Sequence, residues 1–230
     1  MGKYTRYGRK KKMINDYRTI VDNKITIVVC GKNTQVICDK LNSRYANIEE
    51  VSAISLSQLS DDSNSDLFIL VGDIEQADTN VLPATAKFID ITDKKIDHLL
   101  KVQTDINKLR EKIIDGIAAP YLGSIIGLDI SEIVNLIDKS KKIFIGFSDA
   151  ISASDCRKLI TNVIASSGAD MSKCNGVYLS ICGDIDMMQG NEIANCLQET
   201  VGYSADIVWS MIYDNKEIKN DYYILTFFME

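Results

Sequence analysis

The sequence predicts an α/β protein in two parts, a Rossmann-like parallel sheet followed by a four-stranded β-α-β-α-β-β domain, with a long helix between them. Short β-branched runs in the first ninety or so residues alternate with a helical pattern. A proline-free stretch at 95–119 then repeats apolar residues at helical spacing. After residue 140 the strand and helix patterns alternate again and end in two strand-like runs.

Continuous apolar runs in the first half are typical of strands that are covered on both faces, as in a parallel sheet. ITIVVC is followed by Gly31, and LFILV is followed by Gly72. Strand, helix and strand in succession favour a doubly wound α/β unit. The predicted elements are strands at 25–30, 51–56, 67–71 and 88–91 and a helix at 33–44.

One long helix is predicted over most of Lys95–Ala119, and it forms the expected seam between two subdomains. Gly116 is tolerated near its end, and Pro120 lies just beyond it. The apolar residues at helical spacing are Ile96, Leu99, Leu100, Ile106, Leu109, Ile113, Ile114 and Ile117.

The second half predicts strands at 142–147, 176–182, 205–213 and 222–229 and helices at 154–166 and 191–201. The polar stretch Asp214–Asp221 predicts a hairpin between the last two strands. Helices are expected on one face of this sheet. Because Tyr222 and Phe228 share one face of the last strand and Tyr223 and Phe227 the other, aromatic surface would remain for a partner. The expected parts are a tail at 1–23, the α/β unit at 24–94, the helix and connector at 95–126 and the C-terminal domain at 127–230.

Composition is that of a globular protein, with 46% apolar and 25% charged residues in a chain of 230. Residues 1–12 carry six basic side chains and no acid, so a net charge of −6 leaves −12 for the rest. Such a body is not expected to bind nucleic acid specifically. The basic segment could touch RNA, an anionic membrane or the acidic body of a neighbour, although a solvated terminus is the commoner case.

A cytoplasmic location is predicted. The basic start is followed by MINDYRTIVDN, which is too polar for a signal peptide, and no apolar run reaches the ~18 residues of a membrane span. The six cysteines show no CxxC pair, and the single His98 has no partner pattern, so no metal site is expected. Buried, reduced thiols are the simple interpretation.

The order of elements resembles the tubulin/FtsZ superfamily, and the second half resembles bacterial and archaeal FtsZ. DGIAAPYLGSIIGLDISEIV at 115–134 is similar to the end of the FtsZ central helix and its synergy loop. This likeness covers 101–230 in unbroken order, whereas the first half matches only in element order. The other similar segments are KKIFIGFSDA at 141–150, NGVYLSICGDIDMMQGNEIANCL at 175–197, SADIVWSMIYDN at 204–215 and DYYILTFFM at 221–229.

The resemblance implies GTP or GDP as a ligand, held by backbone loops after the first and third strands. Gly31, Lys32 and Asn33 occupy the first loop, where only one glycine of a glycine-rich turn remains. Gly72 precedes the second loop. There DIEQADTN at 73–80, with three acids, stands where the family has GGGTGTG. Like charges facing a triphosphate cost affinity.

A third departure lies on the central helix. Asn107 matches a family asparagine that helps to read the guanine edge, but Lys108 stands where the family has an aspartate. A lysine donates where the aspartate accepts. Since three parts of one site are changed, GTP binding is expected to be lost or much weakened.

Asp129 and Glu132, in GLDISEIV, match the two acids of the synergy loop. In the family these acids enter the next subunit's nucleotide pocket and polarise the water that attacks the γ-phosphate. The pattern D-x-x-E before an apolar helix is also a capping box, which alone explains both residues. An inherited interface contact is the third interpretation.

Asp184, Asp186 and Met187 lie in a loop that faces a neighbouring subunit in the family, and they are the candidate interface residues. Ordinary packing is the alternative. Three functions follow. The first is a diverged FtsZ-like protein of cell division or the cytoskeleton that acts on itself or on an FtsZ-like partner without GTP turnover. The others are an active, polymerising GTPase with an atypical pocket, and an unrelated ligand or partner on the same fold.

Overall fold

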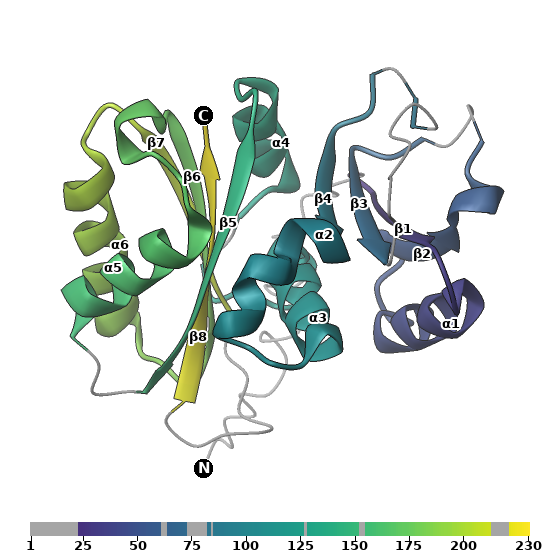
Figure 1. The fold of residues 1–230 in the computed structure, drawn as a ribbon, viewed down its shortest axis with the longest axis horizontal. Helices are drawn as coiled ribbons and strands as arrows, with labels where there is room; N and C mark the ends of the chain where they lie inside the picture. The colour runs from purple at the N-terminus through teal and green to yellow at the C-terminus, as the bar shows by residue number, and fades with distance from the viewer. Residues whose placement is uncertain are drawn as a thin grey trace, which may run out of the picture.

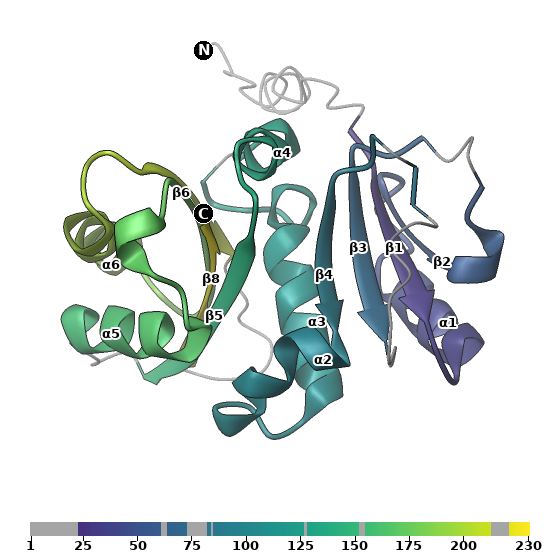
Figure 2. The ribbon, with the colours of Figure 1, turned by 45° about the horizontal axis from the view of Figure 1, so that its top comes forward.

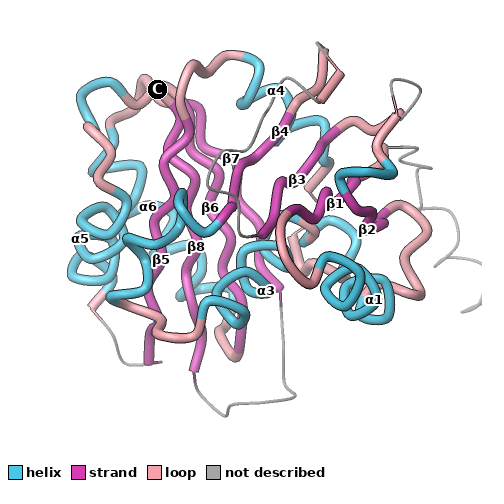
Figure 3. The backbone as a smooth tube through the Cα atoms, turned by 45° about the vertical axis from the view of Figure 1, so that its right-hand side comes forward, coloured by secondary structure: helices cyan, strands magenta, loops and turns pink. Residues whose placement is uncertain are grey.

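Two four-stranded sheets, A and B, form the structure, a computed structural model that describes residues 23–60, 64–72, 82–83, 85–126, 128–151, 155–212 and 221–230. Helix α3 (Ile106–Ile117) runs between the two sheets (Figures 1 and 2). The strands form two separate groups when the molecule is viewed from the side (Figure 3).

Sheet A is parallel throughout and has the order β2-β1-β3-β4. Every residue of β1 and β3 is buried, as the continuous apolar runs predict. The Rossmann-like parallel sheet is therefore confirmed. Its strands are β1 (Ile25–Cys30), β2 (Val51–Ser55), β3 (Leu67–Gly72) and β4 (Phe88–Thr92), and α1 (Thr34–Arg44) follows β1.

One face of sheet A carries the main core. Cys38 and Leu41 of α1 pack there together with Leu109 and Ile113 of α3. A smaller cluster around Phe68 and the residues near Leu82 covers the opposite face. Within the described ranges the α-helices of this half lie on one face, and the other face receives only Leu56 of the short 3-10 helix Leu56–Gln58, so the doubly wound arrangement stays a prediction.

The prediction of one long helix at 95–119 is wrong in its first part. A short helix α2 (Asp93–Ile96) passes into a 3-10 helix (Asp97–Lys101), and α3 begins only at Ile106. Asp105 explains the break, because its carboxylate accepts from the amides of Asn107 (3.0 Å) and Lys108 (3.3 Å) and so starts a new helix. Helical spacing predicted which side chains are buried, but not that the helix is continuous.

Sheet B has the order β5-β8-β6-β7, with strands β5 (Ile143–Ile151), β6 (Gly176–Gly183), β7 (Asp206–Ile212) and β8 (Asp221–Met229). The predicted hairpin is wrong, because β6 lies between β7 and β8. Strand β8 is antiparallel to both β5 and β6, so the chain does reverse direction after β7. A polar stretch indicates such a reversal, but it does not say whether the two strands are neighbours.

Helices cover both faces of sheet B. Helices α5 (Cys156–Ser167) and α6 (Met187–Val201) lie on one face, and α3 and α4 (Ile130–Asp138) lie on the other (Figure 1). The prediction of helices on one face, with free aromatic surface on β8, is therefore wrong. Phe228 packs in the α5–α6 cluster and Phe227 in the α3–α4 core, and both are fully buried.

A buried polar network ties α3 to sheet B. The Tyr178 hydroxyl donates to the carbonyl of Gly116 at 2.5 Å and lies 2.9 Å from Ser210 Oγ. The close approach depends on a residue without a side chain, since a Cβ on Gly116 would lie 2.5 Å from Leu225 Cδ2. Helix α3 is thus packed against both sheets, and one continuous core passes through it.

Within the ranges that the structure covers, no helix is long and apolar enough to cross a bilayer. In the same ranges, no group of three or more His, Cys, Asp or Glu side chains is arranged to hold a metal ion. All six cysteines are free. Four are buried, and Cys156 and Cys196 are partly exposed.

Candidate functional site

The turn between β1 and α1 lies at the carboxyl edge of sheet A, where α/β sheets usually bind ligands. Gly31 and Asn33 both have left-handed backbone conformations, with φ of 86° and 59°. Thr34 Oγ1 donates to the Gly31 carbonyl at 2.7 Å, which holds the turn. Lys32 is exposed at its tip.

A shallow cleft of about 650 Å³ opens beside this turn. It is lined by Cys30, Gly31, Thr34, Gln35, Ser55 at the end of β2 and Ser57 in the 3-10 helix that follows. Of the three residues predicted for the first loop, Gly31 lines it. Its polar lining consists of hydroxyl and amide groups. Burial, reinforced by the charge of Asp90, raises the pKa of the Cys30 thiol to about 11, so this thiol is protonated and not a nucleophile at neutral pH.

Gly72 has a packing role at the same edge. It ends β3, pairs with Cys30 of β1, and has φ of +122°. A Cβ added there would lie 2.1 Å from the Cys30 carbonyl oxygen. The acidic segment 73–80 lies outside the described residues, so its predicted effect on phosphate binding stays a prediction.

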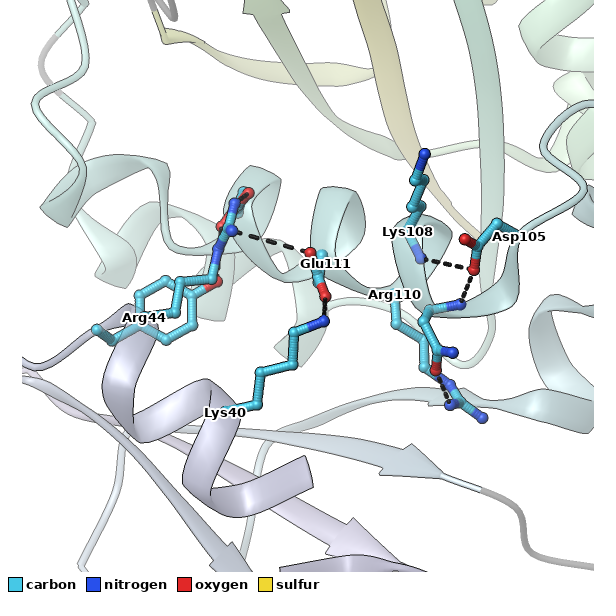
Figure 4. A network of polar contacts seen from close by, with 9 residues as sticks. Lys40, Arg44, Asp105, Lys108, Arg110 and Glu111 are labelled. Carbon is cyan, nitrogen blue, oxygen red and sulfur yellow. Dashed lines mark hydrogen bonds and ion pairs between the residues drawn. The ribbon is translucent and has the colours of Figure 1, made fainter. Parts of the chain in front are cut away.

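Asn107, the candidate base-reading residue, is exposed and is hydrogen-bonded to a neighbour on its own helix. Its side-chain oxygen accepts from Arg110 Nη1 at 3.2 Å (Figure 4). Arg110 is only 8% exposed and forms an ion pair with Asp93, the first residue of α2. Asn107 does not line the cleft beside Gly31, so the structure does not bring these two predicted site residues together there.

An ionic network between α1 and α3 is not among the features predicted from the sequence. Lys40 pairs with Glu111, and Arg44 pairs with Glu111 and with Asp115 (Figure 4). The Tyr45 hydroxyl also donates to Asp115 at 2.6 Å. Basic residues four apart on α1, facing acids four apart on α3, are the signal that could have found it.

The acids of the candidate synergy loop form a complete capping box. The Asp129 carboxylate accepts from the Ser131 amide at 2.9 Å, and the Glu132 carboxylate accepts from the Asp129 amide at 3.1 Å. Asn23 Nδ2 donates to Asp129 at 3.1 Å. Since Asn23 precedes β1, these acids lie at the amino edge of sheet A, opposite the cleft. Within one copy they cannot act on a ligand in it.

Replacing Asp129 with alanine should lower the free energy of unfolding by about 0.5–2 kcal/mol, because α4 loses its N-cap. Urea denaturation measures this. Asp155→Ala is the matched control, since Asp155 caps α5 through the Arg157 amide at 2.9 Å. If Asp129→Ala also abolishes hydrolysis by a GTP-bound partner while Asp155→Ala does not, the acids do more than cap.

The candidate interface residues lie at the start of α6. Asp186 is its N-cap and accepts from the Gln189 amide at 2.8 Å, so it has a structural role. Met187 and Met188 are exposed, Met188 at 82%. An interface role for Asp184, Asp186 and Met187 stays a prediction.

A parallel sheet and a mixed sheet share one core across a central helix, and this fold is that of solved FtsZ structures. It is similar to the empty FtsZ dimer of M. jannaschii, with a TM-score of 0.69 and 11% identity over 97% of this chain and 93% of that one. The W319Y FtsZ mutant of M. jannaschii gives a TM-score of 0.66 and 11% identity over 90% and 91%. A CetZ from Methanosaeta thermophila strain DSM 6194 gives 0.49 and 11% over 89% and 61%. No protein family model and no curated protein matches the sequence.

Proposed function

We propose that this chain is a diverged FtsZ-like protein of the cytoplasm that acts through protein–protein contacts, as a filament component or as a modulator of cell division or the cytoskeleton. In this proposal its GTP binding and turnover are lost or much weakened. The fold supports the class of protein, and the surroundings of Asn107, Asp129 and Glu132 support the loss of turnover.

The observation that carries the proposal is the position of Asn107. Its side-chain oxygen is engaged by Arg110, a nearly buried guanidinium that Asp93 holds in place. To read a base edge with this oxygen, Asn107 would have to give up a hydrogen bond to a charged donor. Because Asn107 is exposed, this bond contributes less than the ~1.5–3 kcal/mol typical of hydrogen bonds to charged groups. Lys108 beside it supplies no acceptor side chain. This part of the expected site therefore favours intramolecular contacts over guanine.

The capping box supports the same conclusion. Asp129 and Glu132 satisfy each other's helix-end groups without any ligand or partner. In a head-to-tail polymer of this chain, they would face a neighbour with little nucleotide to hydrolyse. They would then either act on a different, GTP-bound partner or remain because the cap stabilises α4.

The cleft beside Gly31 favours a second candidate, a GTPase with an atypical pocket. Its volume of about 650 Å³ is in the range of small-molecule sites, and it is lined by the hydroxyl groups of Thr34, Ser55 and Ser57. To donate to a phosphate oxygen, these hydroxyl groups would have to give up hydrogen bonds within the chain. Lys32 is exposed nearby. An unrelated ligand in the same cleft is the third candidate.

A titration with a fluorescent GTP analogue tests the proposal, with an authentic FtsZ as the positive control. We expect no saturation at micromolar analogue, no nucleotide that copurifies, and co-sedimentation with FtsZ filaments or self-assembly without GTP. Micromolar binding that Ser57→Glu abolishes would overturn the proposal in favour of the atypical GTPase. If the chain neither binds the analogue nor assembles nor co-sediments, an unrelated ligand becomes the better account.

A further inference from the structure

A groove of about 670 Å³ lies on the C-terminal domain, along α6 and the start of α5. It belongs to neither edge of sheet A, so nucleotide binding does not account for it. Asp186, Glu192 and Glu199 line it with a single basic residue, Arg157, and Met188 lies at its surface.

The groove is negatively charged and partly apolar. Three carboxylates against one guanidinium leave a net charge of −2 in the lining. Arg157 and Glu199 pair at 3.3 Å, but their side chains are 81% and 55% exposed, so this pair contributes little and a competing cation can displace it. Met188 presents its thioether to solvent, where it can contact an aromatic ring.

The chain carries a segment of matching chemistry. Residues 3–12, KYTRYGRKKK, hold six basic side chains, no acid, and the aromatic residues Tyr4 and Tyr7. Charge-assisted hydrogen bonds would join lysine and arginine to the carboxylates. Tyrosine rings would cover the exposed methionine. We propose that the groove on α5 and α6 binds the basic segment 3–12 of a second copy of this chain.

The position of Asn23 favours a second copy over the same copy. Asn23 is bound by the Tyr121 hydroxyl (2.6 Å) and by Asp129, at the start of α4. Helix α4 lies on one face of sheet B, and α5 and α6 lie on the other (Figures 1 and 2). Residues 13–22 reach at most about 35 Å when fully extended, and they would have to pass around the sheet. The same segment from a neighbour meets no such limit.

Zero-length carbodiimide crosslinking of the full chain tests the inference, because it joins lysine amines to carboxylates that are in contact. An equal mixture of unlabelled and ¹⁵N-labelled copies separates the two sources. We expect mixed-isotope crosslinks from Lys10–Lys12 to Glu192 or Glu199, with and without GTP, that fade in 0.5 M salt as the screening length shortens. Crosslinks only within one copy, or only to Glu49 and Glu50, would overturn it.

A binding measurement with a matched control completes the test. A fluorescent peptide of residues 1–12 is titrated into the full chain. Glu192→Lys/Glu199→Lys should weaken its binding at least about tenfold, the size of a loss of a few charge pairs. Asp39→Lys/Glu49→Lys makes the same change in net charge on exposed residues elsewhere and should change binding less than about twofold. Equal weakening by both variants would show that only the overall charge matters, and the groove would be excluded.

Discussion

Replacing Gly72 with alanine should lower the free energy of unfolding by about 2–6 kcal/mol, the largest effect expected for a single small substitution in this chain. Two costs add. The backbone at Gly72 has φ of +122°, a conformation that costs a side-chain-bearing residue about 1–3 kcal/mol. The new Cβ would also lie 2.1 Å from the Cys30 carbonyl oxygen, so strands β1 and β3 would have to separate. Forced overpacking of this kind costs about 1–3 kcal/mol more.

Gly123→Ala separates the two costs. Gly123 also has a positive φ, +79°, but a Cβ there meets nothing within 4 Å. Gly123→Ala should therefore lower the free energy of unfolding only by the cost of the backbone conformation, about 1 kcal/mol. Urea denaturation of both variants gives the comparison. If the two variants lose equal stability, strand contact at Gly72 is not the cause. In a Gly72→Ala chain that folds, the NMR amide signals at the carboxyl edge of sheet A should also broaden, while those of the rest of the fold should not.

Gly72 shows what sequence reasoning can and cannot supply. The run LFILV followed by glycine correctly predicted a buried strand and its end. The reason for that glycine was not visible, because it depends on the register in which Cys30 faces Gly72 across two strands. Register between strands distant in sequence is a tertiary property, and one residue's slip would move the contact elsewhere.

Two errors in the predicted architecture have the same origin. Asp105 starts a new helix through its carboxylate, but an aspartate in a helical pattern is also compatible with a continuous helix. One face of β8 is expected from the sequence to leave aromatic surface exposed, but α5 and α6 cover Tyr222 and Phe228, and α3 and α4 cover Tyr223 and Phe227. Apolar spacing identifies the buried side chains, but not which distant element covers them.

Of the features predicted for the candidate site, the capping box at Asp129 and Glu132 and the turn at Gly31 are present, and their roles in binding or catalysis stay predictions. The sequence did not indicate the environment of Asn107, since Arg110 and Asp93 meet it only after α2 and α3 fold against each other. The α1–α3 ion pairs were visible as spacing on each helix, but their partners could not be assigned from one sequence.

The second large effect concerns this Arg110–Asp93 pair. Asp93→Ala should lower the free energy of unfolding by about 2–4 kcal/mol, because it leaves the Arg110 guanidinium charged and almost buried without its carboxylate partner. The figure is below that of a fully buried pair because the Asp93 side chain is 35% exposed. Urea denaturation measures the loss. Glu199→Ala in the exposed Arg157–Glu199 pair is the control and should change stability by no more than about 0.5 kcal/mol.

The double variant Asp93→Ala/Arg110→Met should be more stable than Asp93→Ala alone, because methionine fills similar space without burying a positive charge. A recovery of about 1–3 kcal/mol is expected, and no recovery would mean that the two side chains are not energetically coupled. The same variants bear on function, since Arg110→Met releases the side-chain oxygen of Asn107. If Arg110→Met alone brought GTP-analogue binding into the micromolar range, the occupied Asn107 would be the main block to nucleotide. We expect it not to, because Lys108 still replaces the acceptor that guanine requires.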